Sequence, residues 1–276
     1  MPLSMTHDVG VQALQDGGYL SRSDTVAAEE PLEIRLHGEA LAVVMRTPGH
    51  DMELAAGFLC AEEIIRSSDD LESIRHCTSA DADEPENIVE VRLIGSVRES
   101  AEALLAARRA ERATVTSASC GVCGKRSIEA LHTNAPPFER APEIVADRIL
   151  PLPDRLRAAQ QVFDSTGGLH GAAVFDADGQ LVVAREDVGR HNAVDKCVGF
   201  LMMRELLPLK AATLMVSGRT SFEIIQKALV ARIQTVAAVS APSSLAVQLA
   251  NASNMGLVGF VRGGNLNVYA GELVGP

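Results

Sequence analysis

Apolar and polar residues alternate with a period of two in the first third of the chain, the pattern of strands that bury one face. The segments 32–36 and 41–45 predict the two strands of a hairpin, and 88–93 predicts a further strand. Between them, apolar residues at helical spacing predict a helix over 51–65. These elements predict a small α+β domain over residues 31–135.

In the second half of the chain, short apolar strands alternate with amphipathic helices, which is typical of an α/β domain with a partly parallel sheet covered on both faces. A connector with three prolines, 133–143, precedes it, so we place this α/β domain at 136–276. Its predicted strands are 172–175, 181–184, 213–216, 236–239, 257–261 and 266–269, and its predicted helices are 153–165, 191–206, 221–232 and 243–253.

Residues 1–30 are polar and show no periodicity, so the sequence predicts a flexible N-terminal arm there. The whole chain has 276 residues, of which 47% are hydrophobic but only 3% aromatic. The core must therefore be built mainly from aliphatic side chains.

The charge and the apolar runs narrow the class of protein. A net charge of −11 argues against a nucleic-acid partner, because proteins that bind the phosphate backbone usually carry a basic stripe. No apolar run approaches the ~18 residues of a membrane span, and the first residues do not resemble a secretion signal. The sequence predicts a cytoplasmic protein with no membrane partner.

The cysteines provide the first candidate chemistry. The chain has an odd number of them, which does not suggest a disulfide framework in a cytoplasmic protein. Cys120 and Cys123 form a C-x-x-C motif flanked by glycines, which leave a thiol uncovered. Lys125 and Arg126 follow and would lower the pKa of a thiol, favouring its nucleophilic form. The motif is suited to carrying sulfur as a persulfide.

Other interpretations of this motif stay open from spacing alone. A zinc site normally takes four ligands and the chain has no second C-x-x-C, so we expect no structural metal. A dithiol redox motif or a merely structural pair also fits the spacing. Cys60 and Cys197 lie in predicted apolar helices, where cysteine usually acts as a small buried hydrophobe.

A second set of candidate residues lies at three junctions between a strand and a helix, at 187–192, 217–220 and 240–243. In an open α/β sheet such junctions meet at the carboxyl edge of the strands, where ligands bind, and helix N-termini favour phosphate. Ordinary helix capping is the alternative, and Thr220 and Glu223 have the spacing of a capping box. The candidate ligand contacts in and near these junctions are His170, Arg190, His191, Ser217, Gly218, Arg219 and Ser240.

The segment 260–265 ends the last long predicted strand in a glycine turn. A hairpin alone would explain the two glycines. Alternatively, Arg262 contacts a phosphate and Phe260 lies against a flat ring.

Together, these motifs resemble the FdhD family of formate dehydrogenase accessory sulfurtransferases. The resemblance runs in order from residue 47 to residue 271. It is carried by TPGHDMELAAGFLCAEEII, SCGVCGK, TGGLHGAAVF, EDVGRHNAVDK, MVSGRTSFEIIQKA, SAPSSLAVQLA and GFVRGGNLNVYAG.

The resemblance implies a sulfurtransferase that takes sulfur from a cysteine desulfurase. It would pass the sulfur to the bis-molybdopterin guanine dinucleotide cofactor before that cofactor enters formate dehydrogenase. It also implies a homodimer and a C-terminal domain similar to cytidine deaminase, with three layers and a mixed sheet. Two rival functions are a chaperone that only binds the cofactor and a C-x-x-C dithiol oxidoreductase.

Site residues follow from the same resemblance. Cys120 looks like the residue that bears the persulfide, with Cys123 as its partner. Guanine nucleotides such as GDP would occupy the cofactor site. Asn265 stands where many relatives are expected to carry a basic residue, so Arg262 would contribute more here. The implied cofactor-binding segment is Phe260, Val261, Arg262, Gly263, Gly264 and Asn265.

Overall fold

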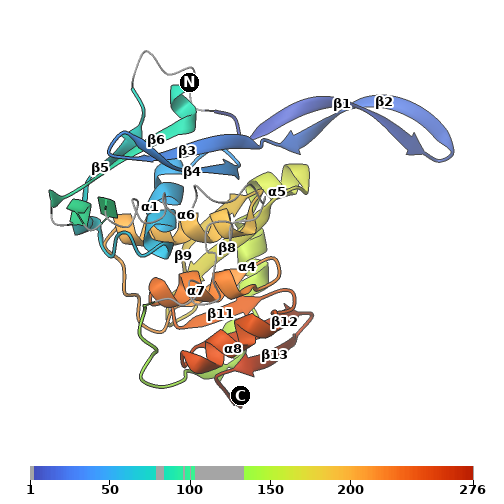
Figure 1. Ribbon diagram of the computed structural model, residues 1–276. Helices are drawn as coiled ribbons and strands as arrows, with labels where there is room; N and C mark the ends of the chain where they lie inside the picture. Colours follow the sequence, from blue (N-terminus) through green and yellow to red (C-terminus); the bar gives the residue numbers. More distant parts are fainter. Residues whose placement is uncertain (1–2, 79–83, 96, 100, 103–133, 276) are drawn as a thin grey trace.

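The computed structural model describes residues 3–78, 84–95, 97–99, 101–102 and 134–275. It is a mixed α/β structure in which strands of several sheets pack with helices (Figure 1). The N-terminal part holds a four-stranded sheet in the order β4-β3-β6-β5. Its strands are β3 (Glu30–Leu36), β4 (Glu39–Arg46), β5 (Leu71–His76) and β6 (Ile88–Leu93), so the hairpin and the third strand predicted from the sequence are confirmed.

Helix α1 (Asp51–Ala61) packs against this sheet and ends four residues before the predicted end at 65. The reason is a left-handed residue, Glu63, with φ of 57° just past the helix. Its N–H donates to the carbonyl of Cys60, and the N–H of Ile64 donates to Leu59. This is the Schellman pattern, which closes a helix by pairing its last carbonyls. Two short 3₁₀ turns, Ser68–Asp70 and Pro85–Asn87, flank β5.

The C-terminal part is built on a six-stranded mixed sheet in the order β13-β12-β11-β10-β8-β9. Strands β10, β11 and β12 are parallel, whereas β8, β9 and β13 run antiparallel to their neighbours, as the predicted mixed sheet requires. The six strands are β8 (His170–Phe175), β9 (Leu181–Asp187), β10 (Thr213–Val216), β11 (Thr235–Ala238), β12 (Gly256–Arg262) and β13 (Asn265–Ala270).

Helices cover both faces of this sheet, which confirms the predicted three layers. One face packs with α6 (Arg190–Met203), α7 (Phe222–Val230) and α8 (Ser244–Ala252). The other packs with α3 (Ala146–Ile149) and α4 (Leu152–Ala158). A short parallel pair, β7 (Glu143–Val145) and β14 (Glu272–Val274), was not predicted.

The single helix predicted over 153–165 is wrong, because two helices occupy this stretch. After α4 the chain turns at Gln160, and α5 (Gln161–Thr166) begins. The carboxylate of Glu186 accepts hydrogen bonds from the backbone N–H groups of Val162 and Phe163. These donors lie in the first turn of α5, so a carboxylate from β9 fixes a helix start that no local residue encodes.

The two predicted domains share one hydrophobic core. Helices α1 and α6 cross at glycines, where a Cβ on Gly57 would lie 1.9 Å from the carbonyl oxygen of Asp195. A Cβ on Gly199 would lie 1.8 Å from the carbonyl oxygen of Glu53. Side chains from both sheets belong to the same buried cluster around this crossing. The domain boundary that we placed near 133–143 stays a prediction.

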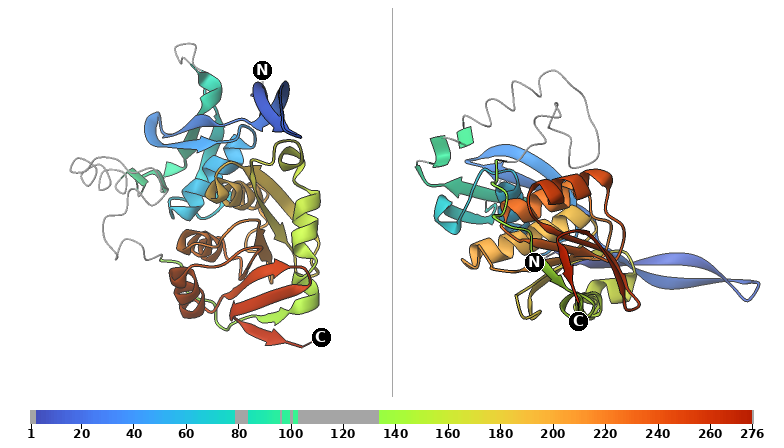
Figure 2. Two further views of the ribbon diagram at one scale, coloured as in Figure 1. Left: turned by 90° about the vertical axis from the view of Figure 1, so that its right-hand side faces the viewer. Right: turned by 90° about the horizontal axis from the view of Figure 1, so that it is seen from below.

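Residues 1–30 include regular structure, which corrects the expectation of an arm without periodicity. Strands β1 (Thr6–Gln15) and β2 (Gly18–Ala27) pair antiparallel in a two-stranded ribbon that projects from the body (Figures 1 and 2). Asp16 and Gly17, both with positive φ, form the tight turn between them. Sequence analysis missed this hairpin although its signals are present, namely the Asp16-Gly17 turn and apolar residues at every second position from Val9 to Ala13. No helix in the described part of the chain is long and apolar enough to span a membrane.

Candidate functional site

The ends of β10, β11 and β12 meet at one edge of the large sheet, as the junction pattern predicted. Past β10, the N–H of Thr220 donates to the carbonyl of Ala241 at 3.2 Å, and the N–H of Ser243 donates back to Thr220 at 2.9 Å. Near the end of β12, the N–H of Phe260 donates to the carbonyl of Ser240 at 3.2 Å. Backbone hydrogen bonds therefore hold the junctions after β10 and β11 and the last residues of β12 together. We call this region the strand-end site.

His170, Arg190 and Gly218 converge at one end of this site. Strand β8 runs antiparallel to β10, so its first residue, His170, lies beside the end of β10. A Cβ on Gly218 would lie 3.4 Å from Nδ1 of His170 and 4.0 Å from Cδ of Arg190. Ser217 contributes its Oγ, which accepts the N–H of Gly171 at 2.9 Å. The lack of a side chain at Gly218 leaves room for a ligand to approach the backbone.

The electrostatics of this end are set by burial. The pKa of His170 is lowered by burial and by the positive charge of Arg190, so its imidazole is neutral at pH 7. Nε of Arg190 is buried and has no hydrogen-bond partner within the described residues. A buried guanidinium N–H without an acceptor is rare, because it loses its hydration on folding. It is a donor suited to an anionic ligand.

His191, Ser221 and Glu223 form a second cluster at the start of α7. Nε2 of His191 lies 2.7 Å from a carboxylate oxygen of Glu223 and 3.1 Å from Oγ of Ser221. The hydrogen bond with His191 holds the pKa of Glu223 below its ordinary value. Oγ1 of Thr220 and the second carboxylate oxygen of Glu223 are buried without a partner in the described structure. This cluster adds unpaired donors and acceptors to the strand-end site.

The predicted capping box of Thr220 and Glu223 is wrong. The residue at the N-cap of α7 is Ser221, and Glu223 turns to His191 instead of to the backbone. At the next junction the ordinary arrangement is present, since Oγ of Ser243 accepts the N–H of Ala246. At the start of α7, Glu223 therefore contacts the side chain of His191 and does not cap the helix.

The last residues of β12, where its register against β13 shifts, include a strained aromatic residue. Phe260 has a φ of 54°, a left-handed conformation that is rare for a bulky side chain and costs about 1–3 kcal/mol. Its half-buried ring has the guanidinium of exposed Arg262 over it, 5.5 Å from the ring centre. Gly263 and Gly264 also have positive φ, and the amide of Asn265 donates to the carbonyl of Gly263.

Within this segment, Val261 differs from its neighbours. Its side chain is fully buried in the core on the α3–α4 face of the sheet. The side chain of Val261 therefore cannot contact a ligand, and the expected contact is left to its backbone. Arg219 and Asn265 are exposed near the same edge, whereas Ser240 contributes the carbonyl that positions Phe260.

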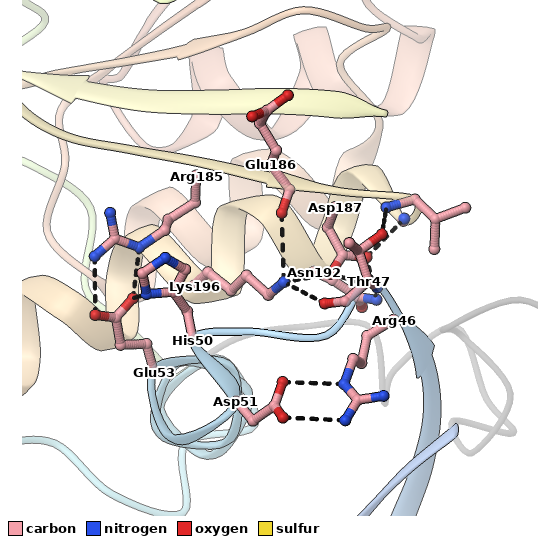
Figure 3. A network of polar contacts seen from close by, with 12 residues as sticks. Arg46, Thr47, His50, Asp51, Glu53, Arg185, Glu186, Asp187, Asn192 and Lys196 are labelled. Carbon is pink, nitrogen blue, oxygen red and sulfur yellow. Dashed lines mark hydrogen bonds and ion pairs between the residues drawn. The ribbon is translucent and has the colours of Figure 1, made fainter. Parts of the chain in front are cut away.

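A buried ionic network supports the junction that carries Arg190 and His191 (Figure 3). Nζ of Lys196 lies 2.7 Å from a carboxylate oxygen of Asp187, and both side chains are fully buried. Lys196 also donates to the carbonyl of Thr47 at 2.8 Å, and the N–H of Thr47 donates to Asp187. The other oxygen of Asp187 accepts from the N–H of Gly189 and the amide of Asn192. The start of α6 is thus tied to the N-terminal part.

Two arginine–carboxylate pairs extend the network (Figure 3). Arg46 makes two hydrogen bonds to Asp51, each of 3.0 Å, and Arg185 makes two to Glu53, of 2.6 and 2.9 Å. Burial raises the pKa of Glu53, but hydrogen bonds from Arg185 and His50 outweigh it and lower that pKa to about 2. Sequence analysis missed these positioning residues. The signal was available, since the two charged residues Asp195 and Lys196 interrupt the apolar run from Ala193 to Met203.

Four of the five cysteines divide into two groups, and half-buried Cys77, which directly follows β5, belongs to neither. Cys120 and Cys123, the predicted sulfur-carrying pair, lie outside the described residues. Cys60 and Cys197 are buried, and burial raises the pKa of each thiol to about 12, so neither ionises at neutral pH. Their predicted role as packing residues is confirmed. Among the residues that the structure describes, no group of three or more His, Cys, Asp or Glu has metal-site geometry.

Comparisons with known proteins match nearly the whole chain. The model of the FdhD/NarQ family matches residues 27–273. The chain is 52% identical over 268 residues to a sulfur carrier protein FdhD of Streptomyces avermitilis, covering 94% of this chain and 92% of the relative. It is 45% identical over 266 residues to a sulfur carrier protein FdhD of Mycobacterium tuberculosis, covering 94% of each.

A solved structure is similar over the same extent. The crystal structure of a candidate formate dehydrogenase accessory protein from Desulfotalea psychrophila has a TM-score of 0.74 to this chain. It is 22% identical, and the match covers 97% of each chain. At this identity the likeness supports the fold.

Proposed function

The chain belongs to the FdhD/NarQ family, and from this premise we propose that it is a sulfur carrier that serves a formate dehydrogenase. Relatives with about half of their residues identical are named sulfur carrier proteins. The match spans both halves of the chain, from the hairpin end to β14, so the proposal concerns the protein as a whole.

In the proposed first step, the thiolate of Cys120 attacks the terminal sulfur of a persulfide on a cysteine desulfurase. A new S–S bond forms on Cys120, and the S–S bond of the donor breaks, so the desulfurase cysteine leaves as a thiolate. The exchange is a thiol–disulfide type reaction and needs no external oxidant.

In the second step, the thiol of Cys123 attacks the inner sulfur of the Cys120 persulfide. A Cys120–Cys123 disulfide forms, and the outer sulfur leaves as sulfide with the electron pair of the broken bond. The acceptor of this sulfur is the molybdenum cofactor, which is a substrate of the protein. A cellular dithiol reductant then returns the disulfide to two thiols.

The buried polar groups without partners at the strand-end site support a nucleotide ligand, and they are the observation that carries the proposed cofactor site. Arg190 has a buried N–H without an acceptor, and Thr220 has a buried hydroxyl without a partner among the described residues. The guanidinium of Arg262 adds a second positive charge, over the half-buried ring of Phe260. Phosphate oxygens would accept hydrogen bonds from Arg190 and Thr220. A guanine ring would stack on the aromatic ring of Phe260.

In this proposal the chain's own residues bind and orient the ligand. Arg190 and Arg262 contact phosphates of the bis-molybdopterin guanine dinucleotide cofactor, and the neutral imidazole of His170 accepts or donates one hydrogen bond without adding charge. The Asp187–Lys196 pair holds the junction that presents Arg190. GDP would occupy part of the same site.

Mass spectrometry tests the sulfur-transfer step. The full chain is incubated with a cysteine desulfurase and cysteine, and we expect a gain of one sulfur atom that is absent in Cys120→Ala. A matched control, Cys77→Ala, should keep the added sulfur. A persulfide that persists on Cys120→Ala would move the carrier role to Cys123.

Calorimetric titration with GDP tests the ligand site separately. We expect Arg190→Ala to weaken binding at least tenfold, whereas exposed Arg92→Ala on β6 should leave it unchanged. GDP binding without persulfide formation would favour a chaperone that only holds the cofactor. Turnover of protein disulfides without a stable persulfide would favour a dithiol oxidoreductase.

Formate dehydrogenase activity in cells tests the role as a whole. Cells that carry the Cys120→Ser/Cys123→Ser double variant should contain formate dehydrogenase protein without its activity. Full activity in such cells would refute the sulfur-carrier role. A cytoplasmic location accords with the proposed donor and client.

A further inference from the structure

Two side-chain pairs connect helices α6 and α7 beside the strand-end site. His191 and Asp195 are one turn apart on α6, and Glu223 and Lys227 are one turn apart on α7. Nε2 of His191 lies 2.7 Å from a carboxylate oxygen of Glu223. One turn further along, Nζ of Lys227 donates to both carboxylate oxygens of Asp195, at 2.7 and 2.8 Å. Each side chain therefore faces an opposite charge across the two helices once the imidazole carries a proton.

The ion pairs around this imidazole contribute no net charge. Lys227 balances Asp195, and their side chains are 13% and 4% exposed. Lys196 balances Asp187 in the same way at the start of α6, where both side chains are fully buried. Glu62, just past the end of α1, acts on Asp195 as a further negative charge. None of these groups offers positive charge to a bound phosphate.

The charges that remain near His191 also cancel. The hydrogen bond with His191 lowers the pKa of Glu223, which is therefore a carboxylate at pH 7. Its charge offsets that of Arg190, whose buried Nε lacks an acceptor among the described residues. His170 adds no charge, since burial and the nearby Arg190 lower its pKa. A phosphate at this end of the strand-end site would therefore meet a cluster without net positive charge.

A carboxylate beside a phosphate site is unfavourable unless its charge is compensated, because like charges that face each other weaken binding. The second carboxylate oxygen of Glu223 is buried and has no partner in the described structure, so water does not screen it. The other cations of the site, Arg219 and Arg262, are exposed, and salt screens their charge. The arrangement therefore calls for one more positive charge close to Glu223.

The ring of His191 is placed to supply that charge. Histidine is the side chain that ordinarily changes charge between about pH 5 and about pH 8. Nε2 of His191 is directed to Glu223 and also contacts Oγ of Ser221 at 3.1 Å. Nδ1, the other ring nitrogen, has no hydrogen-bond partner within the described residues. A carboxylate that accepts from one ring nitrogen fixes the ring and makes the other nitrogen more basic.

We propose that nucleotide binding at the strand-end site is coupled to the uptake of one proton by His191, with Glu223 as the positioning residue that holds the ring. This inference rests on the proposed ligand site. The solvent supplies the proton to Nδ1, which then donates to an oxygen of the diphosphate, while the N–H of Nε2 stays on Glu223. One N–H bond forms, and the complex gains one proton for each nucleotide bound.

Calorimetric titration of the full chain with GDP measures this proton directly. In buffers of different ionisation enthalpy, the slope of the binding enthalpy against the buffer enthalpy gives the number of protons taken up. At about pH 7.5 the terminal phosphate of GDP, with a second pKa of about 6, is already ionised, so it contributes little to the uptake. We expect about half a proton to one proton, and an affinity at least threefold lower at about pH 8.5.

Two variants assign the proton to its residue. His191→Gln keeps an amide donor for Glu223 but cannot titrate, so the uptake should fall close to zero. Glu223→Gln should at least halve the uptake and reduce the change in affinity between the two pH values. A merely structural role of this carboxylate would instead weaken binding equally at both pH values. The matched control is Glu272→Gln, an exposed carboxylate on β14, which should keep the uptake of the native chain.

The outcomes separate this inference from the ligand site on which it rests. GDP that binds with the same enthalpy in every buffer and the same affinity at both pH values would overturn the proton coupling and leave the ligand site in place. Uptake that persists in His191→Gln would overturn it as well, and undiminished uptake in Glu223→Gln would remove the positioning role. GDP that does not bind at either pH would refute the ligand site itself. The titration of the native chain decides the coupling even if a variant fails to fold.

Discussion

Replacing Lys196 by methionine removes the cation from the buried network while keeping a similar volume. Asp187 would lose a partner at 2.7 Å, and the carbonyl of Thr47 would lose a donor at 2.8 Å. Removing one member of a buried ion pair typically costs about 3–5 kcal/mol. Since Asp187 keeps hydrogen bonds from Gly189 and Asn192, we expect the lower part of that range, about 3–4 kcal/mol.

Urea denaturation followed by circular dichroism measures this change as a difference in the free energy of unfolding. The same loss should lower Tm by roughly 6–16 °C in a chain of this size. Lys210→Met, at an exposed position before β10, is the matched control and should change stability by less than about 0.5 kcal/mol.

A double-mutant cycle isolates the pair. Asp187→Asn in the Lys196→Met background should cost much less than Asp187→Asn alone, with a coupling energy of about 1.5 kcal/mol or more. A loss below about 1 kcal/mol for Lys196→Met, or a coupling energy near zero, would refute the description of these two residues as a stabilising buried pair.

Three further predictions follow from other contacts. Gly57→Ala should destabilise the protein by about 3 kcal/mol or more, because its Cβ would collide with the carbonyl of Asp195, whereas Gly95→Ala, with open space around it, should not; thermal unfolding compares them. Because the pKa of Glu53 is about 2 in the fold and 4.5 ordinarily, its stabilising contribution is present above pH 5 and lost as the pH falls toward 2. Glu53→Gln should remove that part of the acid dependence, up to about 3 kcal/mol in urea titrations at about pH 6 and about pH 2.5. Phe260→Gly should relieve backbone strain and leave stability within about 1 kcal/mol, yet weaken GDP binding at least fivefold by calorimetry; unchanged affinity would remove the ring from the ligand site.

The sequence predicted elements best where the local pattern decides the structure. The strands of the large sheet and helices α6, α7 and α8 follow their periodicity to within about three residues. The break between α4 and α5 escaped prediction because Glu186, distant in sequence, caps the second helix. The N-terminal ribbon also escaped prediction, because its Asp16-Gly17 turn and the alternate apolar residues 9, 11 and 13 lie in a segment whose other residues are mostly polar.

The candidate site shows the same division. The junctions were predictable because parallel strands end at one edge, and His170, Arg190 and Gly218 do converge there. The pairing of His191 with Glu223 was not predictable, because it joins two helix starts whose relative position depends on packing. The fully buried Val261 lies on the same core face as Val258, three residues earlier, which strict alternation does not predict, because the register of β12 shifts between Gly259 and Arg262.

Because α1 and α6 cross in direct contact at their glycines, a ligand bound to one part of the molecule should also stabilise the other part. Because the backbones touch and the core is continuous, opening either part exposes apolar surface of the other. A ligand that binds only the native state stabilises that state by mass action. Nucleotide bound at the strand ends should therefore slow amide hydrogen exchange in β3 and β6, far from any contact with it, to the same extent as in β10.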